Sequence, residues 1–212
     1  MSRLTDSLLN SKTHTEPWEY IIFKNALSNE QINEIIKSST NKKNYVNDGT
    51  RSGNKNSKNN KNHPFRLYLT KDNINKYPAL FDLITELQSI KVRKLISKIM
   101  RIDNMFENSF VRLEVIDDQE GFWLEKHCDI EEKLISSLIY VNRTNEDADI
   151  GTDLYDTNLE YVTTIPFEDN LGYFFSGQNK WHGVEKNKKI KKTRKALQLN
   201  YVTFETDWPV DK

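Results

Sequence analysis

Three residues carry side chains from which a metal site could be built: His127, Asp129 and, much further along the chain, His182. One residue separates His127 from Asp129, and residues i and i+2 of a β-strand point to the same face. We therefore expect an imidazole and a carboxylate to project together from one strand. His182 must come from a second strand folded back beside the first. Two histidines and one carboxylate on one side of a metal leave its other positions open.

This donor set is the facial triad that is typical of non-haem Fe(II) oxygenases. Arg194 follows His182 and opens the apolar segment RKALQLNYV, which reads as a strand. A guanidinium stays protonated and matches a carboxylate with two parallel hydrogen bonds. Strand alternation places Arg194, Ala196 and Gln198 on one face. His14 and His63 lie in polar surroundings, and we do not expect them to bind metal.

The sequence resembles the 2-oxoglutarate/Fe(II)-dependent dioxygenase superfamily, and within it the prolyl-4-hydroxylase-like branch. H-x-D alone is a weak signal, but further motifs follow it in the family's order and at the family's spacing. The segments that carry the resemblance are GFWLEKHCD (121–129), SSLIYVN (136–142), GTDLYD (151–156), GYFFSGQNKWHGV (172–184) and RKALQLNYV (194–202). They span roughly residues 110–204.

The resemblance implies that His127, Asp129 and His182 bind Fe(II) and that 2-oxoglutarate chelates the same metal, with O2 as the other cosubstrate. It further implies hydroxylation of a substrate, coupled to release of succinate and CO2, with ascorbate as a stimulant. Related halogenases lack the carboxylate ligand so that halide can bind. The presence of Asp129 therefore favours hydroxylation.

The resemblance also assigns Arg194 to the distal carboxylate of 2-oxoglutarate. Many members have a serine two residues later, whose hydroxyl reaches the same carboxylate, but this chain has Ala196 there. Gln198, on the same face, is the candidate substitute. Tyr140 is another candidate, and the alternation leaves open whether its side chain points toward Arg194.

Composition limits the class of protein. The chain has 212 residues, which suits a single domain over 1–212, and its 31 basic and 31 acidic residues cancel. This balance does not favour a nucleic-acid partner, although lysines crowd between 186 and 195. The lone Cys128 cannot form an intrachain disulfide, and no apolar run is long enough for a signal peptide or a membrane span. We expect a cytoplasmic protein.

The N-terminal part, residues 1–109, is predicted to hold helices and strands in front of the metal-binding core. Residues 1–16 are polar and read as a loosely docked tail, and residues 18–23 as a strand. A capping box at Ser28 opens a helix that runs to about residue 39, with Ile32, Ile35 and Ile36 on its inner face. Residues 65–69 read as a strand, and residues 77–101 as one helix whose apolar stripe is interrupted only at Lys91.

Residues 40–63 contain almost nothing apolar and cannot offset the entropy of becoming ordered. We interpret them as a solvated insertion, with a substrate lid that includes Arg51 as the alternative.

From residue 110 the pattern changes to short strands separated by turns. Strands are expected at 110–116, 122–129, 135–141, 152–155, 159–165, 171–175, 181–184 and 194–204, with turns at 103–104 and 117–121. This spacing favours an α+β, mainly β fold, a double-stranded β-helix (jelly roll, cupin-like) with N-terminal helices packed on one outer face. Residues 110–204 form its core.

Two other functions remain open. A cupin-type isomerase or lyase would need the metal triad but not Arg194, and a non-catalytic jelly-roll binding module would need no metal. For the oxygenase, the substrate could be a protein side chain, a sugar or glycan precursor, or a small metabolite. The shared fold does not select among them.

Overall fold

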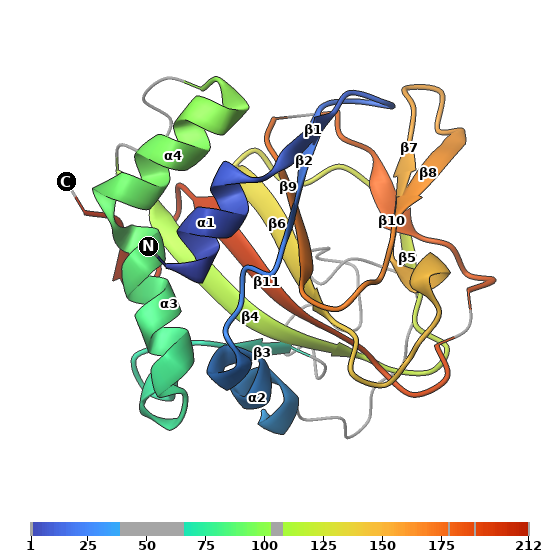
Figure 1. The fold of residues 1–212 in the computed structure, drawn as a ribbon. Coiled ribbons are helices and arrows are strands. Elements are labelled where there is room, and N and C mark those ends of the chain that lie inside the picture. Colours follow the sequence, from blue (N-terminus) through green and yellow to red (C-terminus); the bar gives the residue numbers. More distant parts are fainter. Residues whose placement is uncertain (1, 39–65, 103–107, 178, 189, 212) are drawn as a thin grey trace.

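Two antiparallel sheets form the framework of the fold in the computed structural model (Figure 1), which describes residues 2–38, 66–102, 108–177, 179–188 and 190–211. The larger sheet has the strand order β1 (Lys12–His14), β2 (Tyr20–Lys24), β9 (Leu171–Phe175), β6 (Lys133–Val141), β11 (Arg194–Val202), β4 (Phe110–Asp118), β12 (Trp208–Pro209), with β3 (Arg66–Tyr68) also paired to β4. The smaller sheet has the order β5 (Leu124–His127), β10 (His182–Val184), β7 (Thr152–Tyr155), β8 (Tyr161–Ile165).

Helices cover one face of the larger sheet, and the smaller sheet lies across its other face (Figure 1). The helices are α1 (Arg3–Leu9), α2 (Asn29–Lys37), α3 (Pro78–Gln88) and α4 (Ile90–Met100), with short 3-10 turns at Ile74–Lys76 and Ala148–Ile150. This arrangement confirms the predicted jelly roll with N-terminal helices on one outer face.

The two faces of the larger sheet belong to two separate apolar cores. On β11, Leu197, Leu199 and Tyr201 point into the core beneath the helices. Ala196 points into the second core, between the two sheets. The alternation predicted for residues 194–202 is thus present, and it directs Arg194 toward the space between the sheets.

The predicted helix start at Ser28 is confirmed. The Ser28 hydroxyl accepts from the Gln31 N–H, and the Gln31 side chain accepts from the Ser28 N–H. Ile32 and Ile35 are buried, but Ile36 is 42% exposed, so its placement on the inner face was wrong. The buried Lys195 ammonium, from β11, donates to the carbonyls of Ile35 and Ile36 and ties this helix end to the sheet.

The single helix expected over residues 77–101 is in fact two helices. Ser89 adopts an extended conformation, with ψ at 141°, and its hydroxyl accepts from the Val92 N–H as an N-cap. The apparent defect in the apolar stripe at Lys91 therefore marks the first turn of a new helix. Its exposed side chain interrupts no core.

The N-terminal segment was also predicted wrongly, because residues 1–16 contain α1 and β1. Leu4 and Leu8, one helical turn apart, are both buried in the core beneath the helices. The Ser2 hydroxyl caps the helix by accepting from the Thr5 N–H. Two leucines are too short a pattern to be recognised as a helix without the core they join.

The strand β4 extends two residues further than predicted, through Asp117 and Asp118. Both lie in register with β11, where Asp118 stands opposite Arg194. Two adjacent aspartates favour a turn, but their pairing partners override that local preference. The predicted lid or insertion at 40–63, with Arg51, and the turn at 103–104 lie outside the described residues.

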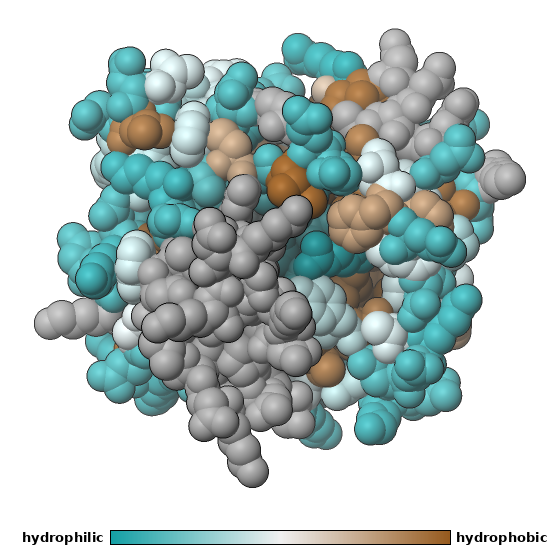
Figure 2. Space-filling model, turned by 180° about the vertical axis from the view of Figure 1, so that it is seen from behind, coloured by the Kyte–Doolittle hydropathy of each residue, from teal (hydrophilic) through white to brown (hydrophobic). Residues whose placement is uncertain are grey.

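Surface hydropathy is mixed. On the face shown in Figure 2, apolar residues stand in small groups among hydrophilic ones, outside the grey atoms. Within the described residues, no helix has the length and apolar character needed to cross a membrane.

Adjacent isoleucines in α2 test the corrected packing. Ile35 is fully buried and Ile36 is exposed, so Ile35→Ala should lower the free energy of unfolding by about 2–5 kcal/mol. The matched control Ile36→Ala should change it by less than about 0.5 kcal/mol. Urea unfolding followed by circular dichroism measures both, and equal losses would contradict this packing.

Candidate metal centre

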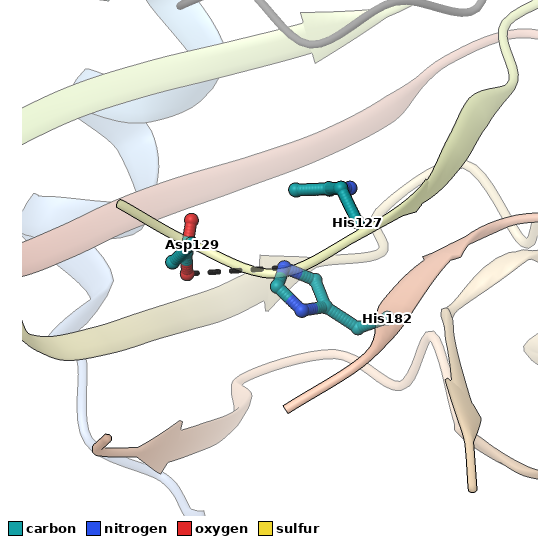
Figure 3. Close-up of side chains that lie close together, drawn as sticks. All are labelled: His127, Asp129 and His182. Carbon is teal, nitrogen blue, oxygen red and sulfur yellow. Dashed lines mark ion pairs between the residues drawn. The ribbon is translucent and has the colours of Figure 1, made fainter. Parts of the chain in front are cut away.

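His127, Asp129 and His182 meet between the two sheets (Figure 3). One potential ligand atom from each lies within 4.8 Å of those of the other two. His127 ends β5 and His182 begins β10, and the two residues stand opposite each other in adjacent antiparallel strands. Asp129 lies two residues beyond the end of β5, so the strand expected over residues 122–129 is shorter than predicted and holds only His127. The three side chains nevertheless come together.

A glycine permits this close strand pairing. A Cβ on Gly183 would lie 2.8 Å from the Leu124 carbonyl oxygen on β5, a distance that real Cβ atoms essentially never show. The glycine in the Trp-His-Gly-Val segment therefore lets β10 approach β5 and sets His182 beside His127.

Both imidazoles are oriented for metal binding. His127 Nδ1 lies 2.8 Å from the Glu125 carbonyl oxygen, and His182 Nδ1 lies 2.8 Å from the Lys180 carbonyl oxygen. A carbonyl only accepts, so each Nδ1 carries a hydrogen, and Nε2 is the nitrogen that each ring has left to offer a metal. Burial, together with the neighbouring His182, lowers the pKa of His127 to about 3, so its ring is neutral at physiological pH.

The carboxylate is held in its ionised form. Burial alone would raise the pKa of Asp129, but the Lys133 ammonium and then His182 hold it well below its usual range. Lys133 Nζ lies 2.6 Å from Asp129 Oδ1, and the Ser136 hydroxyl donates to Oδ2. Sequence reasoning missed both partners. Their spacing after Asp129 was visible, but their direction depends on how β6 packs.

A cavity of about 330 Å³ joins this cluster to Arg194. Arg194 is 3% exposed. It donates from Nε to the Ile150 carbonyl at 2.7 Å and from Nη1 to Asp118 Oδ2 at 2.7 Å. Its Nη2 lies 3.2 Å from the Thr152 hydroxyl. The guanidinium is therefore fixed in direction. It lies beside Tyr140 on β6, roughly 13 Å along that strand from Ser136, which donates to Asp129, so Arg194 and the carboxylate ligand stand apart in the cavity.

Tyr140 lies beside Arg194, which resolves the orientation that the alternation left open. Its hydroxyl is 3.5 Å from Arg194 Nη2 and 2.6 Å from the Thr152 hydroxyl. Tyr173 donates to the same Thr152 oxygen at 3.0 Å. Thr152 and Tyr173 lie in two of the motif segments, but only the sheet pairing shows that they reach this point.

Gln198 occupies a different part of the cavity. It lies roughly 13 Å along the strand from Arg194 and accepts from Arg66 Nη1 at 2.8 Å. The partners of the Arg194 guanidinium among the described residues are those given above, and Gln198 is not one of them. The hydroxyls that do lie beside the Arg194 guanidinium are those of Thr152 and Tyr140.

The basic run between 186 and 195 is less positive than its sequence indicates. Four of its residues face carboxylates: Lys188 pairs with Asp153, Lys191 with Asp147, Arg194 with Asp118 and Lys195 with Asp117. His14 is exposed, stacks on Tyr20 and is not a member of the His127–Asp129–His182 cluster.

Comparison with solved structures shows which known fold the chain has. The chain is similar to a prolyl hydroxylase of Trichoplax adhaerens in complex with a hypoxia inducible factor oxygen degradation domain peptide fragment, at 16% identity and a TM-score of 0.57, over 95% of this chain and 88% of that one. It is also similar to a prolyl-4-hydroxylase of Pseudomonas putida, at 11% identity and a TM-score of 0.50, over 66% and 72% of the two chains. No protein-family model and no curated protein matches the sequence.

The chain therefore has the fold of prolyl hydroxylases. This confirms the fold that the sequence resemblance implied, on structures that share few identical residues with it.

Metal binding tests the triad. His182→Ala removes one of three ligands and should weaken Mn(II) or Fe(II) binding at least about tenfold, because the carboxylate and one imidazole then hold the metal alone. His14→Ala, a matched loss of an exposed histidine, should leave the affinity unchanged. Anaerobic calorimetric titration of the metal measures both, and an unchanged affinity in His182→Ala would remove His182 from the site.

Proposed function

We propose that this protein is a 2-oxoglutarate- and Fe(II)-dependent oxygenase that hydroxylates an organic substrate and releases succinate and CO2. The observation that carries the proposal is one cavity with the His127–Asp129–His182 cluster toward one end and the Arg194 guanidinium toward the other. A metal-chelating acid with a distal carboxylate has a partner at each end of such a cavity.

The residues present fit the metal. Two imidazoles and one carboxylate are the ligands that the facial iron triad uses, and because each Nδ1–H is held by a carbonyl, Nε2 is the nitrogen that each imidazole would offer the metal. With Fe(II), this set carries a net charge of about +1, which suits a dianionic ligand. Iron bound here would supply the activation of O2 that couples decarboxylation of 2-oxoglutarate to oxidation of a C–H bond.

The protein's own residues orient the reactants. Lys133 and Ser136 hold the Asp129 carboxylate, so its direction is set before a metal binds. Arg194 offers N–H groups to the distal carboxylate of the cosubstrate, with the Thr152 and Tyr140 hydroxyls beside it. The apolar side chains of Phe122, Leu124 and Val184 line the cavity and limit the access of water.

A second candidate, a cupin-type isomerase or lyase that uses the metal without 2-oxoglutarate, has one observation in its favour. The Arg194 charge is already matched by Asp118, so the cavity does not need an anionic ligand to balance it. A non-catalytic jelly-roll module is the third reading, and it requires that no metal binds.

Cosubstrate binding separates these functions. Anaerobic addition of Fe(II) and then 2-oxoglutarate should produce a visible metal-to-ligand charge-transfer band. Arg194→Gln should keep metal binding but raise the dissociation constant of 2-oxoglutarate about tenfold to a hundredfold, because it loses charge-assisted hydrogen bonds. Arg143→Gln, at an exposed ion pair with Asp169, is the matched control.

Each other outcome selects a different function. Metal binding without a band indicates the isomerase or lyase, and no metal binding indicates the binding module. Because Arg194→Gln leaves the Asp118 carboxylate buried without its partner, the double variant with Asp118→Asn provides a second protein in which to measure the affinity.

A further inference from the structure

Asp118 is a buried carboxylate in the place where the cosubstrate's distal carboxylate would bind. Its side chain is 0% exposed and lines the cavity together with Arg194. Oδ2 lies 2.7 Å from Arg194 Nη1, while Oδ1 has no hydrogen-bond partner among the described residues. Neither the triad nor the resemblance assigns this residue a role.

The Arg194–Asp118 pair is neutral as a unit, and the guanidinium still has room for a ligand. Nη2 directs its two N–H groups to the Thr152 and Tyr140 hydroxyls, whereas Nη1 uses one N–H on Asp118 and retains a second one. A carboxylate that binds there adds a negative charge to a pair that is already balanced. Two carboxylates would then share one guanidinium in a site that is largely closed to water.

Carboxylates that share a buried site do not both stay ionised, because the repulsion raises the pKa of one of them strongly. Burial already raises the pKa of Asp118, against the opposing effects of Arg194 and Arg66. The remaining charged neighbour, Asp117 on the same strand, raises it further.

Arg66, on β3, is the one other cation named above that acts on Asp118, and its charge is shared with another carboxylate. It lies near Glu114, at 3.9 Å, and donates to Gln198. Tyr140 on β6 and Tyr173 on β9 are neutral, because burial raises the pKa of both phenols. The metal-binding imidazoles lie toward the other end of the cavity.

We propose that Asp118 binds 2-oxoglutarate together with Arg194, as a carboxylic acid that takes one proton from solvent when the cosubstrate enters. The Asp118 carboxylate plus a solvent proton gives the acid, and no other bond is made or broken. Oδ2 continues to accept from Arg194, and the new O–H on Oδ1 donates to the ligand's distal carboxylate. The inference rests on the proposed function, because it requires 2-oxoglutarate to bind in this cavity.

Calorimetry in two buffers tests the proton directly. The protein is loaded with Mn(II), which does not turn over, and titrated with 2-oxoglutarate at neutral pH in phosphate and in Tris. The two observed enthalpies should differ by the buffers' ionisation enthalpies multiplied by about one proton taken up per cosubstrate. Above neutral pH, the affinity should fall about tenfold per pH unit.

Asp118→Asn should bind 2-oxoglutarate at least as tightly as the unaltered protein at neutral pH, without proton uptake and without this pH dependence. The amide keeps an acceptor for Arg194 and brings a neutral donor. The matched control is Glu114→Gln, which changes another buried carboxylate on the same face of β4, paired with Arg112. It should keep the proton uptake.

An infrared difference spectrum of the unaltered protein gives a readout that needs no variant. Binding of 2-oxoglutarate should add the carbonyl band of a protonated carboxyl group. Binding without proton uptake and without this band, or uptake that persists in Asp118→Asn, overturns the role of Asp118 and leaves the oxygenase proposal intact. Failure of the metal-loaded protein to bind 2-oxoglutarate overturns the oxygenase proposal itself.

Discussion

The strand β11 is the element on which both the core and the candidate site depend. It lies between β4 and β6 in the larger sheet, paired along its whole length with β4 and along most of it with β6. Its odd-numbered residues, such as Leu197, anchor the helices, and its even-numbered ones, beginning with Arg194, face the smaller sheet. A slip of one residue would exchange these sets, so helix packing and the placement of the guanidinium are set by the same register.

Two ion pairs lie at different places in the cavity, while Arg66 and Arg112 share the Glu114 carboxylate. Toward one end, Asp129 is held by Lys133, and toward the other, Arg194 is held by Asp118. Buried charges persist in a fold when they are paired in this way. A metal cation beside Asp129 therefore adds positive charge at one place, and an anionic ligand beside Arg194 adds negative charge at the other, which a proton on Asp118 would offset. This electrostatic balance connects the metal end of the cavity to the cosubstrate end.

Local signals were interpreted well where they act within a few residues. The capping box at Ser28 is present, and the boundaries of β7 and β9 were predicted as they stand. The errors occur where a local preference was overridden. Asp117 and Asp118 read as a turn but extend a strand, because β11 pairs with them. The helix break at Ser89 was interpreted as an interruption of an apolar stripe, because a serine within a helical pattern cannot be recognised as a cap from the sequence alone.

The sequence by itself identified the candidate donors His127, Asp129 and His182, the alternation along β11 and the cation at Arg194. The candidate donors and the cation follow from residue type, and the alternation along β11 follows from the two-residue period of a strand. Only the tertiary structure decided that Tyr140, Thr152 and Tyr173 gather at Arg194. It also decided that Gln198 contacts Arg66 instead, and that Asp118 is the counter-ion of Arg194. The reason is that strand pairing brings together residues far apart along the chain, and a short stretch of sequence does not specify which strand will lie beside it.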